Sequence, residues 1–152
     1  MSPVVPQDAR HLVELHANVS NEGASGQTRF QVIDAIGELS DGPYALPPNT
    51  ALVVTDVLVT RNATEGVYEG WVDSMPGPQG GQTESRIRFR FDSTQQGMLH
   101  LPLSSGVVFA NPPVVWGSAV NPGWFTIRLL GYLTPYLGRL MPPVVPEPPV
   151  LA

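Results

Sequence analysis

Prolines and glycines interrupt this chain too often for long helices to form. Its 152 residues include 17 prolines and 15 glycines. Many of them cluster in segments that predict turns or loops, namely DGP at 41–43, LPPN at 46–49, MPGPQGG at 75–81, NPP at 111–113 and NPG at 121–123. The chain is therefore expected to fold from short elements joined by turns.

The segments between these breaks have the pattern of β-strands, in which apolar and polar residues alternate or β-branched residues are frequent. We expect strands near 12–20, 28–37, 51–60, 66–73, 85–92, 97–103, 106–110, 113–117 and 124–133. Residues 8–16 also fit a helix with Asp8 as its cap, but the alternation of Val13, Leu15 and Ala17 favours a strand. Short strands at this spacing predict an all-β sandwich, jelly roll or barrel.

The two ends of the chain differ from its middle. SPVVP near the start and MPPVVPEPPVLA at 141–152 are too rich in proline for central strands. Such segments favour the polyproline II conformation along a surface. We therefore expect an extended arm at 1–10, one β domain at 11–135 and a proline-rich arm at 136–152, because a chain of this length forms one core.

Composition narrows the classes of function. Charged residues make up 14% of the chain and the net charge is −5, which argues against a surface that attracts nucleic acid. A weakly charged surface can instead be covered by further copies or by partners. The lack of cysteine excludes disulfides and Cys-ligated zinc. The first residues lack the regions of a signal peptide, and no apolar run is long enough for a membrane span.

The segment SRIRFRFD at 85–92 places an arginine at every second position. In a strand, Arg86, Arg88 and Arg90 point to one face, while the apolar residues between them point to the core. The arginine column fits a solvated face paired with carboxylates such as Glu69 or Asp73. It also fits a row of ion pairs between subunits, or a site for an anionic ligand.

No sequence motif indicates catalysis, a cofactor or a metal centre. His11 and His16 do not share a face in a strand or in a helix, and His100 is expected at a surface or interface. Four acidic residues near turns offer oxygen ligands without a spacing that singles them out, namely Asp34, Asp41, Asp56 and Asp92. We therefore expect no enzyme and no bound cofactor.

The segment VYEGWVD at 67–73 is the most suggestive local group. As a strand it places Glu69, Trp71 and Asp73 on one face, and surfaces that combine an aromatic ring with acids bind sugars. The two carboxyl groups are about 13 Å apart along a strand, which is too far for the acid pair of a glycosidase. A sugar-binding face without hydrolysis is the alternative that this group supports.

The segment WFTIRLLGYLTP at 124–135 resembles the closing strand of the tumour-necrosis-factor-like jelly rolls, which include the globular heads of complement-type proteins. Those heads end in an aromatic residue, a glycine, an aromatic residue and an aliphatic residue. Gly131, Tyr132 and Leu133 match the core of that ending. The chain beyond Pro135 departs from the family, whose heads usually stop soon after this strand. The resemblance implies an antiparallel β-sandwich of jelly-roll type that forms a compact homotrimer.

In that family, aromatic residues from facing strands pack along the threefold axis. The resemblance makes Tyr132 and Leu133 candidates for this axis, with Phe125, Trp124 and Trp116 as further candidates for the oligomer interface. Similar jelly-roll trimers occur in viral and phage surface proteins, including capsid decoration domains, whose extended arms reach neighbouring subunits.

The sequence thus predicts a non-enzymatic structural or assembly protein, a self-associating jelly-roll protomer that decorates or builds a larger particle such as a phage or virus capsid. Its expected partners are further copies of itself and neighbouring structural proteins, in a virion or an extracellular surface assembly. The alternative is a carbohydrate- or ligand-binding β-sandwich module that uses Glu69, Trp71 and Asp73.

Overall fold

The computed structural model describes residues 12–20, 28–34, 36–61, 65–75, 84–119 and 124–136, and in these ranges it has nine strands and no helix. The strands are β1 (Leu12–Ser20), β2 (Thr28–Arg29), β3 (Gln31–Ile33), β4 (Thr50–Arg61), β5 (Val67–Ser74), β6 (Glu84–Asp92), β7 (Met98–Phe109), β8 (Pro113–Ala119) and β9 (Trp124–Pro135). The all-β prediction is confirmed, and none of the described segments is a helix that could cross a membrane. The expected arms at 1–10 and 136–152 lie outside the described residues except for Tyr136.

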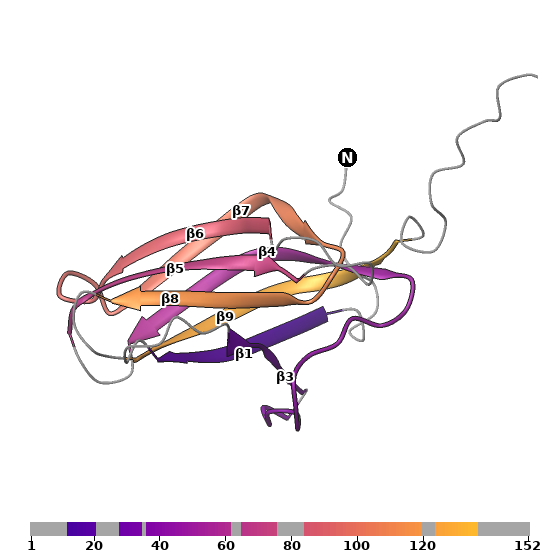
Figure 1. The fold of residues 1–152 in the computed structure, drawn as a ribbon, viewed down its shortest axis with the longest axis horizontal. Coiled ribbons are helices and arrows are strands. Elements are labelled where there is room, and N and C mark those ends of the chain that lie inside the picture. The colour runs from indigo at the N-terminus through magenta and orange to yellow at the C-terminus, as the bar shows by residue number, and fades with distance from the viewer. Residues whose placement is uncertain are drawn as a thin grey trace, which may run out of the picture.

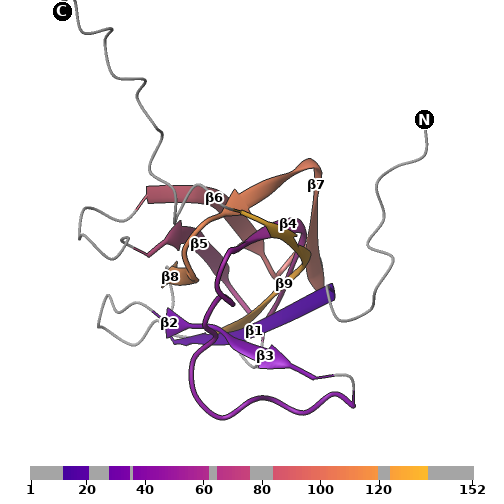
Figure 2. The same ribbon diagram turned by 90° about the vertical axis from the view of Figure 1, so that its right-hand side faces the viewer.

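The strands form two antiparallel sheets packed face to face, as Figures 1 and 2 show. One sheet has five strands in the order β3-β1-β9-β4-β7, and the other has four in the order β2-β8-β5-β6. The predicted antiparallel β-sandwich is therefore present. Each sheet has an inner face in the shared core and an outer face directed away from it.

Three of the predicted strands differ from the structure. The segment expected as one strand at 28–37 divides, because β2 pairs with β8 in one sheet while β3 pairs with β1 in the other. Phe30 marks the crossing and is buried in the core. Conversely, the two strands expected at 97–103 and 106–110 form the single irregular strand β7, in which Gly106 has a φ of 73°.

The core lies between the sheets, where alternate residues of each strand meet. β6 contributes Ile87, Phe89 and Phe91, as the alternation in its sequence predicts. The rings of Phe89 and Phe125 meet edge to face with centroids 5.7 Å apart. Tyr68 joins this aromatic group, with its centroid 5.8 Å from that of Phe125. Burial of such rings supplies much of the hydrophobic stabilisation of a sandwich.

Strand pairing follows a nested order along the chain. β5 pairs with β6, β4 pairs with β7, β2 pairs with β8, and β1 pairs with β9. Each successive pair therefore encloses the one before it. β9 also pairs with β4 and so occupies the middle of the five-stranded sheet.

Candidate functional site

The outer face of the five-stranded sheet carries a band of apolar side chains, here called the apolar row, formed by Leu12, Tyr132, Val53 and Val108. These residues are cross-strand partners on β1, β9, β4 and β7, so their side chains lie next to one another on one face. Leu12 is 59% exposed and Val108 is 45% exposed, whereas Val53 is nearly buried. Apolar residues that adjoin in this way on an outer face form a candidate contact surface.

Two glycines shape the sheet at this row. A Cβ on Gly131 would overlap the backbone carbonyl of Val53, so only glycine permits the close approach of β9 to β4 beside Tyr132. On the other side, a Cβ on Gly106 would lie 2.5 Å from Val53 Cγ1. The irregular part of β7 therefore lies against Val53, which explains the burial of that side chain on an outer face.

Beside the apolar row, this outer face carries polar groups together with the apolar side chains of Leu58, Met98 and Leu130. Arg128 Nη1 lies 3.5 Å from Glu14 Oε1, and His100 Nε2 lies 2.8 Å from Asp56 Oδ1. The hydrogen bond with His100, supported by one from Thr55, lowers the pKa of Asp56. Partial burial, with the positive charge of Arg128, lowers the pKa of His16 below its ordinary value. His100 is exposed opposite the core-facing leucines, as predicted.

The outer face of the four-stranded sheet has a different chemistry, and we call its central part the Trp–Arg face: Trp116, Trp71, Arg88, Glu69 and Arg90. Trp71 lies opposite Trp116 on one side and Arg88 on the other. The two indole rings are nearly parallel, with centroids 6.5 Å apart and 14° between their planes. Glu69 lies opposite Arg90 in the next row. A depression of about 500 Å³ is lined by Glu69, Gly70, Trp71, Arg88, Phe89 and Arg90, whereas Trp116 lies beside it.

Asp73 does not join this surface as predicted. It follows Glu69 and Trp71 on the same face of β5, but its side chain is only 5% exposed. The predicted ligand-binding face therefore exposes Glu69 and part of Trp71 but almost none of Asp73, and the sugar-binding role stays a prediction. Among the described residues, Asp73 Oδ1 and Trp116 Nε1 are buried polar atoms without a hydrogen-bond partner.

The arginine column lies on this outer face, as the alternation predicts, but the expected pairing with Glu69 or Asp73 is not formed by Arg88 or Arg90 within the described part of the chain. Arg86 donates from Nη2 to the carbonyl oxygen of Val108 at 3.1 Å, which links the edge strands of the two sheets. Glu69 and Arg90 are cross-strand partners without an ion pair between them among the described residues.

The residues expected at the oligomer interface are scattered. Tyr132 is half-buried on the outer face of the five-stranded sheet. Leu133 packs against the core, and Phe125 is fully buried in it, so Phe125 is not available to a neighbouring subunit. Trp116 lies on the opposite side of the sandwich, on the Trp–Arg face. The side chain of Trp124 and all of His11 lie outside the described residues.

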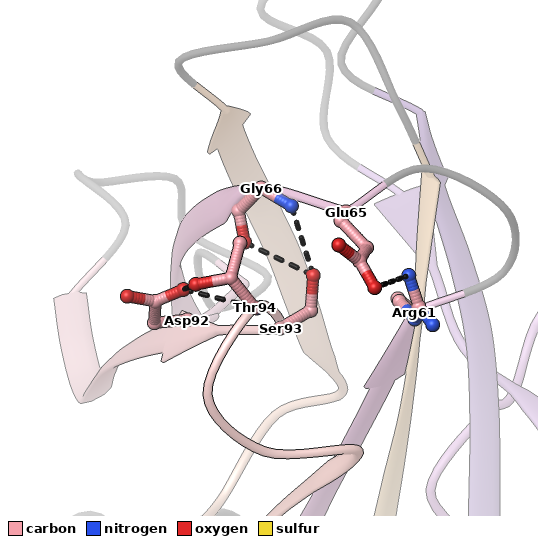
Figure 3. A network of polar contacts seen from close by, with 6 residues as sticks. All are labelled: Arg61, Glu65, Gly66, Asp92, Ser93 and Thr94. Atoms are coloured by element: carbon pink, nitrogen blue, oxygen red, sulfur yellow. Dashed lines mark hydrogen bonds and ion pairs between the residues drawn. The ribbon is translucent and has the colours of Figure 1, made fainter.

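The acidic residues near turns accept hydrogen bonds from the backbone and from neighbouring side chains. Figure 3 shows Asp92, whose Oδ1 accepts from the backbone N–H and the hydroxyl of Thr94, next to Ser93, whose hydroxyl accepts from the N–H of Gly66 and donates to its carbonyl. Arg61 pairs with Glu65 at 3.2 Å across the same end of the sandwich. Within the described ranges no group of three or more acidic or histidine side chains is placed to hold a metal ion.

Asp34 caps a turn in the same manner, because its Oδ1 accepts from the backbone N–H groups of Ile36 and Glu38. Three of the acidic residues that the sequence suggested as oxygen ligands therefore bind neighbouring groups of the chain, namely Asp34, Asp56 and Asp92.

No protein-family model matches the chain, and no curated protein matches it in sequence. The residues that sequence reasoning missed are Leu12, Val53, Val108 and the pairing of Trp71 with Trp116. Only the strand register joins them, since they come from segments far apart in the sequence.

Proposed function

We propose that this chain is a non-enzymatic assembly protein: a jelly-roll protomer that self-associates as a trimer through the apolar row, and that builds or decorates a larger particle such as a capsid. The observation that carries the proposal is the apolar row itself. It crosses four adjacent strands and leaves Leu12 and Val108 about half exposed.

The nested strand order supports the jelly-roll part of the proposal. A jelly roll consists of eight strands in two sheets connected by Greek keys. If the short strand β3 is set aside, the first strand pairs with the last, the second with the one before it, and so on inward. This is the pairing of a long hairpin wound into two layers.

The position of Tyr132 supports the trimer. The resemblance of the closing strand to tumour-necrosis-factor-like proteins implies an aromatic residue at the threefold axis. Tyr132 lies within the apolar row, between Leu12 and Val53, whereas the core-facing Leu133 does not. An interface with an apolar centre and a polar rim is typical of stable oligomers, and the Glu14–Arg128 pair adjoins the row.

The test is the native mass of the full chain by size exclusion with light scattering across a dilution series. The expected mass is about 49 kDa, three copies of the 16.4 kDa chain. Val108→Glu and Leu12→Glu place a charge at exposed positions, so they are expected to leave the fold intact and to release monomers.

Ile36→Glu is the matched control, because Ile36 is 78% exposed and lies in the turn after β3, outside the apolar row. It is expected to keep the mass of the parent chain. A parent chain that is monomeric at every concentration, or variants of Val108 and Leu12 that keep the parent mass, would overturn the proposed interface.

A further inference from the structure

The Trp–Arg face has the layout of a small-molecule site. Across β8, β5 and β6, one row of the sheet presents Trp116, Trp71 and Arg88, and the next row presents Glu69 beside Arg90. Directly opposed side chains on one face have Cβ atoms about 5 Å apart. Aromatic, cationic and anionic groups therefore surround one depression, whose volume of about 500 Å³ is within the usual range for ligand sites.

Among the described residues, the two cations of this face have no partners of their own. Arg88 and Arg90 are exposed, and within the described part of the chain neither forms a hydrogen bond or an ion pair. Asp92, the next acidic residue on β6, is engaged by Thr94, and Arg90 contributes only the weakest of the effects on its pKa. Two arginines whose backbone positions are about 7 Å apart along one strand thus face solvent in a chain whose net charge is −5.

We propose that the Trp–Arg face binds an acidic oligosaccharide, that is, pyranose rings carrying carboxylate or sulfate groups. The C–H face of a sugar ring packs on the half-buried indole of Trp71. Arg88 and Arg90 donate hydrogen bonds to the anionic substituent, since a guanidinium fork matches a carboxylate or sulfate. Glu69 accepts hydrogen bonds from the ring hydroxyls.

Glu69 separates this ligand class from nucleic acid. A polyphosphate chain places negative charge along its whole length and is bound by broad basic surfaces. At the Trp–Arg face a carboxylate lies beside the two arginines, so a second anion close to Glu69 is repelled. A ligand with hydroxyl groups around one anionic group fits both charges of the face.

The test is calorimetric titration, with tryptophan fluorescence as a second readout, of the full chain. The probes are a κ-carrageenan oligosaccharide for sulfate and a hyaluronan oligosaccharide for carboxylate, both of which have uncharged rings between their anionic groups. Cellohexaose serves as a neutral sugar and a single-stranded oligothymidylate as a non-sugar polyanion. Saturable binding of at least one acidic oligosaccharide is expected. We expect cellohexaose and oligothymidylate to bind at least about tenfold more weakly, because each lacks one of the two features recognised.

Variants then locate the site. Arg88→Gln and Arg90→Gln change exposed side chains and are each expected to weaken binding of the acidic oligosaccharide by about tenfold or more. Trp71→Ala is expected to abolish both binding and the fluorescence response. Arg61→Gln is the matched control, because it removes one positive charge at the end of β4, where the arginine pairs with Glu65, and it should bind like the parent.

Three outcomes overturn the proposal: no binding of either acidic oligosaccharide, equal binding of cellohexaose, or binding of oligothymidylate as tight as that of the sugars. Equal loss in Arg61→Gln and Arg88→Gln also overturns it, since the effect would then reflect net charge. If Trp71→Ala does not fold, the two exposed arginine variants still decide the result.

Discussion

The two outer faces of the sandwich have the same strand geometry but expose different chemical groups. The five-stranded sheet leaves apolar area exposed at Leu12 and Val108, while its charged residues are paired within the chain, as in His100 with Asp56. Among the described residues, the four-stranded sheet leaves Arg88 and Arg90 without an ion pair, next to two half-buried indoles. The first face is suited to another protein surface and the second to a small anionic ligand.

This difference teaches that the chemistry of a sheet face is set by its cross-strand neighbours more than by any one strand. Trp71 is a single aromatic residue of β5, but Trp116 and Arg88 on either side of it extend it into an aromatic and cationic surface. Tyr132 alone resembles a family motif, yet Leu12, Val53 and Val108 extend it into a row. The following predictions test whether the two faces are independent, from the largest expected effect to the smallest.

The largest effect is expected from one glycine in each sheet. In Gly131→Ala the new methyl group meets the backbone of Val53, which cannot move aside, whereas in Gly70→Ala it meets the ring of Phe89. We expect the free energy of unfolding to fall by about 3 kcal/mol or more in Gly131→Ala and by about 1–2 kcal/mol in Gly70→Ala. Urea denaturation measures both; an equal loss in the two variants would contradict the rigid approach of β9 to β4.

The second largest effect is expected from salt, which should weaken ligand binding at the Trp–Arg face but not association through the apolar row. Raising sodium chloride from about 0.05 M to about 0.5 M shortens the Debye length, so binding of an acidic oligosaccharide to Arg88 and Arg90 is expected to weaken by about tenfold. Association through the apolar row is expected to persist, because burial of apolar surface is not screened by salt. Calorimetry and light scattering at both concentrations measure the two responses; dissociation of the oligomer in high salt would contradict the assignment of its interface.

Acid should affect the face of the five-stranded sheet through His16. Its lowered pKa means that the unfolded chain takes up the proton first, so stability is full above pH 6.5 or so and declines as the pH falls toward the folded pKa. His16→Gln removes this part of the decline. Urea midpoints at about pH 8 and about pH 5 measure it, and a parent and variant with the same change would contradict the effect of burial on His16.

Asp56 adds a separate decline in stronger acid. Its pKa is lowered by the hydrogen bond from His100, so its contribution is present above its ordinary value and is lost as the pH falls through the lowered one. Asp56→Asn is expected to reduce the loss of stability below about pH 4. Acid titration of the folded fraction by circular dichroism measures this change, with Asp34→Asn as the control in an exposed turn.

The smallest effect is expected at Tyr44, which belongs to neither face. Its hydroxyl is buried without a hydrogen-bond partner among the described residues, and burial raises its pKa to about 12. Tyr44→Phe removes the unpaired hydroxyl, so stability is expected to stay equal or rise by up to about 1 kcal/mol. The parent is expected to lose stability between about pH 10 and about pH 12, and this decline should be absent from the variant. A loss of stability at pH 7 would reveal a bond to the hydroxyl, and a changed native mass would link this residue to the apolar row.

Alternation along single strands was predictable from the sequence. Ile87, Phe89 and Phe91 face the core and the arginines between them face outward, because successive side chains of a strand point to opposite sides. Alternation is less plain where both sides of a strand are apolar. In β9, Leu129 faces the core while Leu130 and Tyr132 face outward, and only Thr126 and Arg128 mark the outward face of the segment WFTIRLLGYLTP.

Pairing between strands was beyond the sequence. The stacking of Trp71 on Trp116 follows from the register of β5 with β8, which no spacing in the chain encodes. The burial of Asp73 was also hidden, because an acid at an outward position is expected to meet water. The change of sheet at Phe30 was also missed. The segment was predicted as one strand, but its two parts pair with different strands, β2 with β8 and β3 with β1.

The central place of β9 has a consequence for how the chain reaches its fold. β1 and β4 belong to one sheet but do not pair with each other, since β9 lies between them. Glu14 of β1 pairs with Leu130 of β9, and Val53 of β4 pairs with Tyr132 of β9, so neither pair can form before β9 is present. During synthesis β1 and β4 leave the ribosome well before β9, and they can join one sheet only after β9 has emerged. We expect slow folding, typical of distant pairings, and an interval in which the edges of β1 and β4 are open to the wrong partners.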